Sequence, residues 1–407
     1  MATIRPFRAY MPTLGMEDKI AALPYDVYNR EEACKVVEAN PDSFLRIDRA
    51  ETNFDADVDT YADVVYAKAD ELIKDWIKTG RFVQSDKDCY YLYQQIMDGR
   101  PQTGIVGCAA VEDYNNNIIK KHENTLAAKE ADRIRHIDTT NMQTGPIFLA
   151  FRTNDDIDSF LARITDSTPY FDIVSEDGIG HKVWIVDAPE DIAFIKAQFE
   201  SMNAIYIADG HHRCASACKV GGKRHEDGVD KESDYFLSVL FPENQLKIMD
   251  YNRVVKDLNG YDVPTFLEEL ETYFDIGASD IPVKPACKGQ CGMYLDNQWY
   301  SLVLKSEWKD EDPVEGLDVS ILQKYVLDGM LDIKDPKNDK RVDFVGGIRG
   351  LSELERRCNA DCKVAFAMYP TDIKELFAVA DAGRLMPPKS TWFEPKLRSG
   401  LFLHDIK

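Results

Sequence analysis

The segment AIYIADGHHRCASACKV, residues 204–220, places an aspartate, two histidines and an arginine directly after an apolar run. Residues 204–208 are short and rich in β-forming side chains, so they predict a buried strand. Residues 213–220 carry small and apolar side chains at helical spacing, which makes Asp209-Gly210 the expected turn and puts both histidines at the start of a helix. The N–H groups of a first helical turn lack internal partners and attract anions. Arg213 adds a planar donor fork, so the segment predicts a phosphate-binding site.

Simpler interpretations of this segment exist. Asp209 could only cap the helix, and a lone histidine in such a place is more often structural than chemical. The combination of two adjacent histidines with an arginine and an aspartate favours function. A metal site is less favoured, because adjacent histidines on a helix point about a hundred degrees apart, whereas metal-binding pairs are usually about three or four residues apart.

Two further groups of residues could do chemistry. IIKKHENT places His122 and Glu123 just after a strand-like pair of isoleucines, and its default interpretation is a solvated charged loop. PPKSTWF places Lys389, Ser390 and Thr391 after two prolines that fix the backbone. By itself this second segment is typical of a rigid loop that holds the C-terminus on a core.

The composition limits the class of protein. The chain has 407 residues, is 44% hydrophobic and carries a net charge of −22. This charge argues against general attraction to nucleic acid or to an anionic membrane, so phosphate chemistry would need a local positive site. The N-terminal residues do not resemble a signal peptide, and no apolar run approaches a membrane span. We therefore expect a cytoplasmic protein with small-molecule partners.

The nine cysteines predict free thiols. The last six form three pairs spaced four apart, at residues 214/218, 287/291 and 358/362. This spacing puts both members on one face if the segment is helical. Zinc sites more often have two intervening residues, so reduced thiols are expected and metal binding is the less favoured alternative.

The remaining pattern mixes helices and strands and predicts an α+β fold. Residues 55–82 have a long amphipathic helical pattern. Residues 89–114 contain two strand-like runs joined by Asp98-Gly99, a turn-forming pair. Residues 118–151 suggest a polar turn, a charged helix and a strand, and strands alternate with helices again after residue 245.

Taken together, three motifs resemble the signature of free-serine kinases built on the ParB/sulfiredoxin-like fold. They are DGHHR at 209–213, the His122-Glu123 turn before a helix, and Pro388-Lys389-Ser390-Thr391 near the end of the sequence. The resemblance implies an N-terminal extension over residues 1–85, a ParB/sulfiredoxin-like catalytic core over 86–245 and a C-terminal α/β substrate domain over 246–407. The extension has no counterpart in the short ADP-using kinases of this family.

The resemblance implies a phosphotransferase that interconverts free L-serine and O-phospho-L-serine with pyrophosphate or ADP as phosphate donor. Pyrophosphate is slightly favoured as the donor, because the chain is long like the pyrophosphate-using members of this family. Its sequence also shows no obvious adenine pocket. Sulfiredoxins carry a cysteine where His211 stands, so sulfinic-acid repair is not expected. The alternative is a ParB-like nucleotide-binding regulatory protein without kinase activity, although the basic DNA-binding module of ParB proteins is missing.

Each motif then receives an expected role. Glu123 is the expected general base, because a serine hydroxyl is a weak nucleophile until its proton is accepted. The other expected site residues are Asp209 and His212 in catalysis; His211, Arg213, Cys214 and Ala215 at the phosphate; and His122, Asn252, Arg253, Lys389, Ser390 and Thr391 at the amino acid. Mg²⁺ is the expected cofactor, with Asp209 as its ligand, because a carboxylate beside phosphates needs a cation or an orienting role.

Overall fold

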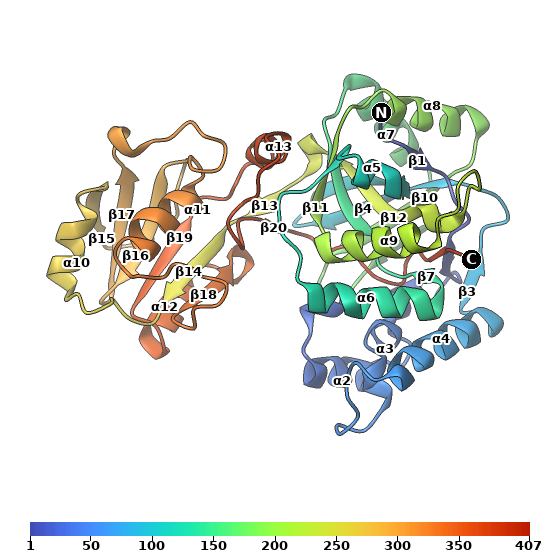
Figure 1. The fold of residues 1–407 in the computed structure, drawn as a ribbon, viewed down its shortest axis with the longest axis horizontal. Coiled ribbons are helices and arrows are strands. Elements are labelled where there is room, and N and C mark those ends of the chain that lie inside the picture. The colour runs from blue at the N-terminus through green and yellow to red at the C-terminus, as the bar shows by residue number, and fades with distance from the viewer. The chain divides into compact units, whose positions relative to one another are not determined.

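A computed structural model describes residues 1–407 and divides into two compact units. The first unit comprises residues 1–246 and 395–407, and the second comprises residues 247–394. The predicted extension over 1–85 therefore lies in one unit with the predicted core, together with the last residues of the sequence. Helices and strands are mixed in both units, which confirms the α+β class (Figure 1).

A nine-stranded sheet forms the centre of the first unit. Its order is β6-β11-β8-β12-β5-β4-β10-β9, and β1 pairs with β5 off this path. The turn between β4 and β5 is made by Asp98 and Gly99 with φ of 53° and 76°, so this hairpin is as predicted. The strands are β1 (Ile4–Arg5), β4 (Tyr90–Met97), β5 (Arg100–Ala110), β6 (Ile119–Lys120), β8 (Ile147–Phe151), β9 (Phe171–Val174), β10 (Gly180–Val186), β11 (Ile205–Asp209) and β12 (Tyr235–Pro242).

Helices cover this sheet in successive layers. α9 packs on α6, and α6 packs on α4, which belongs to the helical N-terminal segment (Figure 1). The N-terminal segment has its own core around Phe44, Trp76 and Phe82. The helices of this unit are α1 (Glu17–Ile20), α2 (Arg30–Ala39), α3 (Leu45–Asp48), α4 (Asp63–Lys78), α5 (Val111–Asn115), α6 (Ala127–Thr140), α7 (Asp155–Thr165), α8 (Pro189–Glu200) and α9 (His211–Arg224).

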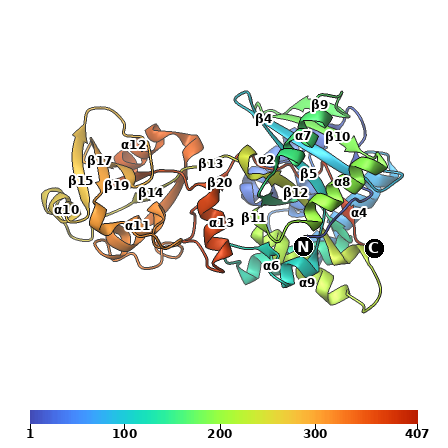
Figure 2. The ribbon, with the colours of Figure 1, turned by 90° about the horizontal axis from the view of Figure 1, so that it is seen from above.

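The second unit is built on a six-stranded antiparallel sheet in the order β15-β17-β16-β19-β14-β18. In both views α10 lies near β15, at the edge of this sheet (Figure 2). A short pair, β13 with β20, accompanies the sheet. The elements are β13 (Ile248–Met249), β14 (Tyr251–Val255), α10 (Val263–Leu270), β15 (Phe274–Ser279), β16 (Gln290–Leu295), β17 (Gln298–Leu304), α11 (Asp318–Ile321), β18 (Val342–Gly346), α12 (Leu351–Ala360), β19 (Val364–Met368), α13 (Ile373–Asp381) and β20 (Trp392–Phe393).

Residues 395–407, here named the C-terminal strap, complete the first unit. β21 (His404–Asp405) pairs with β7 (Met142–Gln143), and a further bridge joins Leu403 to Tyr10 of β2 (Tyr10–Pro12), which itself pairs with β3 (Phe82–Gln84). Leu401, Phe402 and Leu403 are fully buried. The strap is therefore part of the core of a unit whose other residues end at position 246.

All nine cysteines are free thiols. Cys214 and Cys218 lie in one helix, α9, as their spacing predicts. The other two pairs do not share a helix, because Cys291 lies in strand β16 and Cys362 follows the end of α12. None of the helices is both long enough and apolar enough to span a bilayer.

Candidate active site

The DGHHR segment forms a tight passage from β11 into α9. Gly210 is the N-cap residue with φ of 88°, a conformation that favours glycine. A Cβ at this position would lie 3.0 to 3.2 Å from the Arg213 guanidinium, so glycine also makes room for that side chain. No side chain caps α9, and its first turn holds no acidic residue. The simpler role for Asp209, a helix cap, is therefore not what the structure shows.

Arg213 lies close enough to Asp209 to lower the pKa of that carboxyl, without forming an ion pair with it. Its Nη1 donates to the Pro146 carbonyl at 2.7 Å, and it forms no ion pair. In a chain with a net charge of −22, this cation supplies the local positive charge that a phosphate site needs. A helix N-terminus and a guanidinium fork together suit a phosphate oxygen.

Asp209 is paired with a lysine that the sequence motifs do not include. Its Oδ2 lies 3.1 Å from Lys396 Nζ of the C-terminal strap, and its Oδ1 accepts the Gly210 N–H at 2.8 Å. Burial alone would raise the pKa of Asp209, but the cations Lys396 and Arg213 outweigh it and hold the pKa well below its usual range. Asp209 is therefore an anion that orients a lysine. The only sequence signal for Lys396 is a basic residue shortly after the KST motif.

His122 and His211 form a buried pair. Their ring centroids are 4.5 Å apart with the rings nearly perpendicular. His122 is 2% exposed and bonds to the Ile207 backbone, and burial lowers its pKa to about 4. Burial and the neighbouring His122 likewise lower the pKa of His211 well below its usual value. Both rings are neutral near pH 7, so they hold the Glu123 segment against α9 and supply no positive charge to a phosphate.

His212 also contacts the segment that contains Glu123. Its Nε2 accepts the Leu126 N–H at 3.0 Å, which joins the first turn of α9 to the turn that follows Glu123. Glu123 itself is half-buried. The structure thus brings together two predicted motifs that are far apart in the sequence, although this contact commits Nε2 of His212 to the backbone.

Cys214 and Ala215 point into the core of the first unit. Burial raises the pKa of the Cys214 thiol well above its usual value, and Cys218 accepts or shares a hydrogen bond with it. Neither side chain can therefore contact a phosphate, and any contribution from these two residues is limited to the backbone of α9.

In the second unit, Arg253 is a buried cation without an acidic partner. It is 3% exposed and forms no ion pair. Its guanidinium donates to the backbone carbonyls of Tyr251 and, at 3.1 Å, of Lys389, and it lies over the Phe344 ring. Burial lowers its pKa to about 10, so it is still charged at neutral pH. A buried charge is costly unless it is paired, and an anionic ligand would supply the missing partner.

The PKST loop lies next to this arginine. Lys389 is exposed, adopts φ of 60° and lies with Nζ 5.6 Å from the centroid of the Tyr251 ring. Ser390 is buried and its hydroxyl donates to the Pro387 carbonyl at 2.7 Å, whereas Thr391 is half-buried. Lys389 is thus the member of the loop that is best placed to meet an anion from solution.

Asn252 is committed to the fold. Its Oδ1 accepts the Met368 N–H at 2.8 Å, and its Nδ2 donates to Asp250 Oδ2 at 2.7 Å. Because both ends of the amide are bonded within the protein, this placement favours a structural role for Asn252, in contrast to the expected contact with an amino acid.

The residues do not form a resident magnesium site. No group of three or more histidine, cysteine, aspartate or glutamate side chains is arranged to hold a metal ion. Asp209, the expected ligand, already has one oxygen on Lys396 and the other on the Gly210 N–H. These residues therefore do not fit a metal bound by the protein alone.

Comparison with known proteins identifies a family that matches this chain, and it finds solved structures whose similarity to the chain is low. Residues 4–320 match the family described as "Protein of unknown function (DUF1015)". A free serine kinase in complex with AMP is 14% identical, over 75% of this chain and 91% of that chain, with a TM-score of 0.37. SbnI with C-terminal truncation, from Staphylococcus aureus, is 13% identical over 71% of this chain and 82% of that chain, with a TM-score of 0.37.

A conserved hypothetical protein from Pyrococcus furiosus is 14% identical over 73% of this chain and 93% of that chain, with a TM-score of 0.34. Among curated proteins none matches. Because these TM-scores are low, the function has to be argued from the chain's own residues.

Proposed function

The chain belongs to the family of proteins of unknown function DUF1015, and we propose that it is a phosphotransferase that interconverts free L-serine and O-phospho-L-serine. The observation that carries this proposal is Arg213: a cation that forms no ion pair, at the uncapped start of α9, with the Glu123 segment held beside it. The three motifs and their resemblance to free-serine kinases support the choice of substrate.

On the phosphate side, the transferred group spreads its negative charge over its oxygens, and catalysis consists mostly of positioning and charge stabilisation. Arg213 and the first N–H groups of α9 are the proposed donors. Lys396 adds a second cation, held at 3.1 Å from Asp209. His212 is proposed to position this turn, since its Nε2 is used by the Leu126 N–H.

On the hydroxyl side, Glu123 is the proposed general base. The serine oxygen attacks phosphorus, the bond from phosphorus to the leaving oxygen of the donor breaks, and Glu123 accepts the hydroxyl proton. With pyrophosphate as donor the products are phosphoserine, inorganic phosphate and that proton. With ADP the leaving group is AMP. In the reverse direction, protonated Glu123 returns the proton to the serine oxygen.

The second unit holds its own group of residues that suits an anion. Arg253 is buried and lacks an acidic partner, and Lys389 is exposed without an ion pair. A carboxylate bound there would compensate the charge of Arg253. Ser390 and Thr391 are proposed to shape the loop beside Arg253 in this unit.

Magnesium enters this proposal with the phosphate donor. Mg²⁺ commonly arrives bound to substrate phosphates and needs only one or two protein carboxylates. We assign the ion no step, because Asp209 is paired with Lys396.

The direct test is an assay of L-serine with pyrophosphate, ADP and ATP in parallel, each with magnesium. Phosphorus NMR and mass spectrometry would detect phosphoserine and the co-product, and phosphoserine with phosphate would test the reverse reaction. We expect turnover with pyrophosphate. If no donor gives phosphoserine and the protein instead binds duplex DNA tightly in a salt-sensitive manner, the ParB-like alternative replaces this proposal.

Replacing Arg213 with Ala tests the observation that carries the proposal. Hydrogen bonds to charged groups are worth about 1.5–3 kcal/mol, so the affinity for pyrophosphate should fall by roughly ten- to a hundredfold. Calorimetric titration with pyrophosphate would measure this loss. Arg163→Ala is the matched control, because Arg163 is an exposed arginine of α7 that pairs with Asp191 at 2.5 Å. Equal affinities for the two variants would remove Arg213 from the phosphate site.

A further inference from the structure

A cavity of about 180 Å³ lies between the N-terminal segment and helix α6 of the first unit, and we name it the N-terminal cavity. Helix α6 contributes one face to it, with Lys129, Asp132, Arg133 and His136 at helical spacing. None of the residues assigned to the proposed phosphotransfer lines this cavity. Because a cavity of about 150 Å³ can hold benzene, the N-terminal cavity has room for a small organic molecule.

A second, much smaller cavity adjoins it. Tyr25, Asp48, Arg133 and His136 line both cavities, whereas Arg213 lines only the smaller one. The smaller cavity has a volume of about 30 Å³. This is room for little more than a water molecule, so we place no ligand in it.

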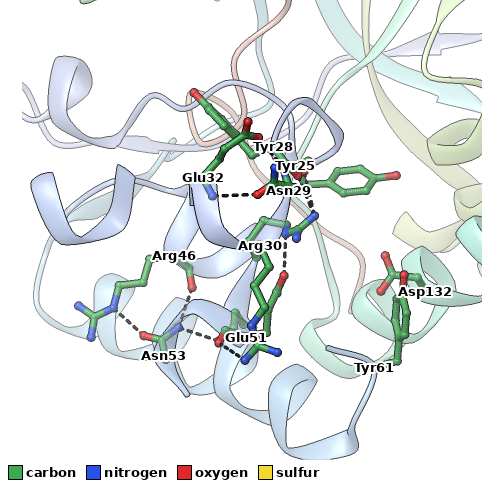
Figure 3. Close-up of polar contacts among 12 residues, drawn as sticks. Tyr25, Tyr28, Asn29, Arg30, Glu32, Arg46, Glu51, Asn53, Tyr61 and Asp132 are labelled. Atoms are coloured by element: carbon green, nitrogen blue, oxygen red, sulfur yellow. Dashed lines mark hydrogen bonds and ion pairs between the residues drawn. The ribbon is translucent and has the colours of Figure 1, made fainter. Parts of the chain in front are cut away.

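Hydrogen bonds within the N-terminal segment hold the walls of the cavity (Figure 3). Arg46 Nε donates to Asn53 Oδ1 at 2.7 Å, and Asn53 Nδ2 returns a bond to the Arg46 carbonyl at 3.0 Å. Figure 3 also shows Tyr25 and Tyr61 of this segment with Asp132 of α6, all of which line the cavity. The space is therefore shaped by bonded elements before any ligand enters.

His136 presents an unused hydrogen-bond acceptor at the cavity. The side chain is 3% exposed, and its Nε2 has no hydrogen-bond partner. The ring bonds to the backbone of Ile47, which leaves Nε2 as the free nitrogen. Burial and the nearby Arg133 lower the pKa of His136 to about 4, so the ring is neutral and Nε2 carries a lone pair at neutral pH. A buried acceptor of this kind calls for an N–H or O–H donor.

The charge of the lining selects among such donors. With His136 neutral, four carboxylates face three cations: Asp26, Asp48, Glu51 and Asp132 against Arg49, Lys129 and Arg133. The lining therefore carries one net negative charge. This charge favours a singly charged cation and disfavours a phosphate or a carboxylate.

Ion pairs within the lining use up most of the buried charges. Arg49 pairs with Glu51 at 2.7 Å. Arg133 pairs with Asp132 at 2.8 Å, and Asp132 also accepts the Tyr66 hydroxyl at 2.8 Å. Arg133 is therefore neutralised where it stands and does not repel a cation from the rest of the cavity.

Asp48 is the buried carboxylate of the lining that these pairs leave. It is 3% exposed, accepts the Thr144 hydroxyl at 2.7 Å and forms no ion pair. It lies close enough to His136 to act on the charge of that ring. A single cationic N–H group can thus compensate the Asp48 carboxylate and donate to the His136 lone pair.

The remaining walls are apolar or aromatic. Ala50 and Val65 line the cavity together with the rings of Tyr28 and Tyr61. Ala50 and Val65 are buried, whereas Tyr61 is exposed and marks the side that opens to solvent. These walls suit a short hydrocarbon group attached to the cationic head.

We propose that the N-terminal cavity binds a small primary amine as its ammonium ion, with the ammonium group donating to His136 Nε2 and its charge balanced by Asp48. The short hydrocarbon tail packs on Val65 and the tyrosine rings. This ligand carries neither a carboxylate nor a phosphate, so the site differs in chemistry from the proposed phosphotransfer and shares no residue with it. It gives the first 85 residues a function as one wall of a binding site.

The test is titration of the full-length protein with n-butylamine near neutral pH, where this amine is protonated. Calorimetry would measure its affinity, and nitrogen NMR of the histidine rings would report the hydrogen bond to Nε2. The resonance that is missing from a His136→Phe variant identifies this ring. We expect saturable binding and a shift of that resonance.

Matched ligands separate the charge from the donor. Butanol lacks the charge, butyrate reverses it, tetramethylammonium keeps it without an N–H group, and L-alanine adds a carboxylate to the ammonium group. Each should bind at least about tenfold more weakly than n-butylamine, because each loses the charge balance or the hydrogen bond.

Variants test the two residues directly. His136→Phe keeps a ring but removes the acceptor, and Asp48→Asn removes the charge while an oxygen remains for Thr144. Each should weaken the binding of n-butylamine by roughly ten- to a hundredfold. Asp113→Asn is the matched control, because Asp113 is a buried aspartate of the same unit that lies outside the cavity. Melting temperatures would verify that each variant is folded.

The proposal is overturned if n-butylamine does not bind saturably, if butanol or L-alanine binds as tightly, or if both variants keep the wild-type affinity. The ligand series on the unaltered protein decides the matter even where a variant fails to fold. Because no phosphate donor is present, the result is independent of the phosphoserine assay.

Discussion

Glu123 is the residue with the sharpest proposed role. Replacing it with Gln keeps shape and hydrogen bonding but removes the basic charge, so turnover should fall by roughly two to four orders of magnitude. The KM for serine should change much less, because a base acts mainly in the transition state. Steady-state assays of phosphoserine formation would measure both. Glu190→Gln, an exposed glutamate of α8, is the matched control. Near wild-type turnover of a folded Glu123→Gln variant would contradict the assignment.

The buried histidines make stability depend on pH. Burial lowers the pKa of His122 and His136 to about 4 and that of His181 to about 3, against an ordinary value of 6.5. Below pH 6.5 the unfolded chain therefore binds more protons than the folded chain, and stability falls as the pH is lowered toward 4. Each histidine contributes at most about 1.4 kcal/mol per pH unit in this window.

Urea unfolding at a series of pH values would measure this effect. We expect a clear loss of unfolding free energy between about pH 7 and pH 5. A His122→Asn variant should show a shallower slope, because one titrating group is gone. A wild-type stability that stays flat through this window would show that these rings are protonated in the folded protein.

At the scale of elements, the C-terminal strap positions Lys396. Gln95 of β4 donates to the Lys396 carbonyl at 2.8 Å. Two residues further on, buried Arg398 pairs with Asp177 and donates to Ser175 Oγ at 3.1 Å. Lys396 is therefore held through its own carbonyl by Gln95 and through the strap by Arg398, while its ammonium group contacts Asp209.

Replacing Lys396 with Met should lower turnover by about ten- to a hundredfold, and it should also lower the melting temperature, because the half-buried Asp209 carboxylate loses its ion-pair partner. Arg398→Met removes a buried cation that pairs with Asp177, so it should lower the melting temperature further. Turnover should fall as well, because Arg398 helps to hold the strap that carries Lys396. Calorimetry and the phosphoserine assay would distinguish the two. A Lys396→Met variant with full activity would exclude this lysine from the reaction.

Local patterns predicted several elements well. The β4–β5 hairpin follows from Asp98-Gly99, and the strand that precedes DGHHR follows from its β-forming run. α9 begins at His211, two positions before the small and apolar periodicity becomes visible, because the polar residues of its first turn interrupt the apolar pattern. Only the resemblance to free-serine kinases placed His122 near DGHHR, because no local sequence rule relates residues so far apart.

Other features could not be predicted because they depend on distant pairing. Lys396 and Asp209 are separated by 187 positions, and a lysine shortly after a proline-rich loop has no distinctive local signal. Burial also changed several roles: His211, Cys214 and Asn252 have chemically suitable side chains that turn out to be inside the fold. Side-chain type and spacing predict which chemistry is available, whereas exposure decides which residues can take part.

At the scale of the whole molecule, the first unit is discontinuous in sequence. Deleting residues 395–407 removes Leu401, Phe402 and Leu403 from its core. Burying such a side chain is worth about 1.5–3 kcal/mol, so the loss approaches the total stability of a typical domain, about 5–15 kcal/mol. We expect the first unit to lose its cooperative unfolding transition and the second unit, which lacks these residues, to keep its own.

Scanning calorimetry of the intact and truncated proteins would test this expectation. Circular dichroism would show in parallel whether the helices of the first unit are lost. Deletion with no change in either measurement would show that the strap is an accessory to a core that is already complete.

The return of the strap also sets an order of assembly during translation. The ribosome makes residues 247–394 before it makes the strap, so the second unit emerges while the sheet of the first unit still waits for Leu403 to pair with Tyr10 and for Phe402 to reach Tyr91. Asp209 meets Lys396 only after residues 247–394 have been made. A polypeptide released before residue 396 would therefore carry every DGHHR atom and still lack the lysine beside it, which couples the proposed activity to synthesis of the strap.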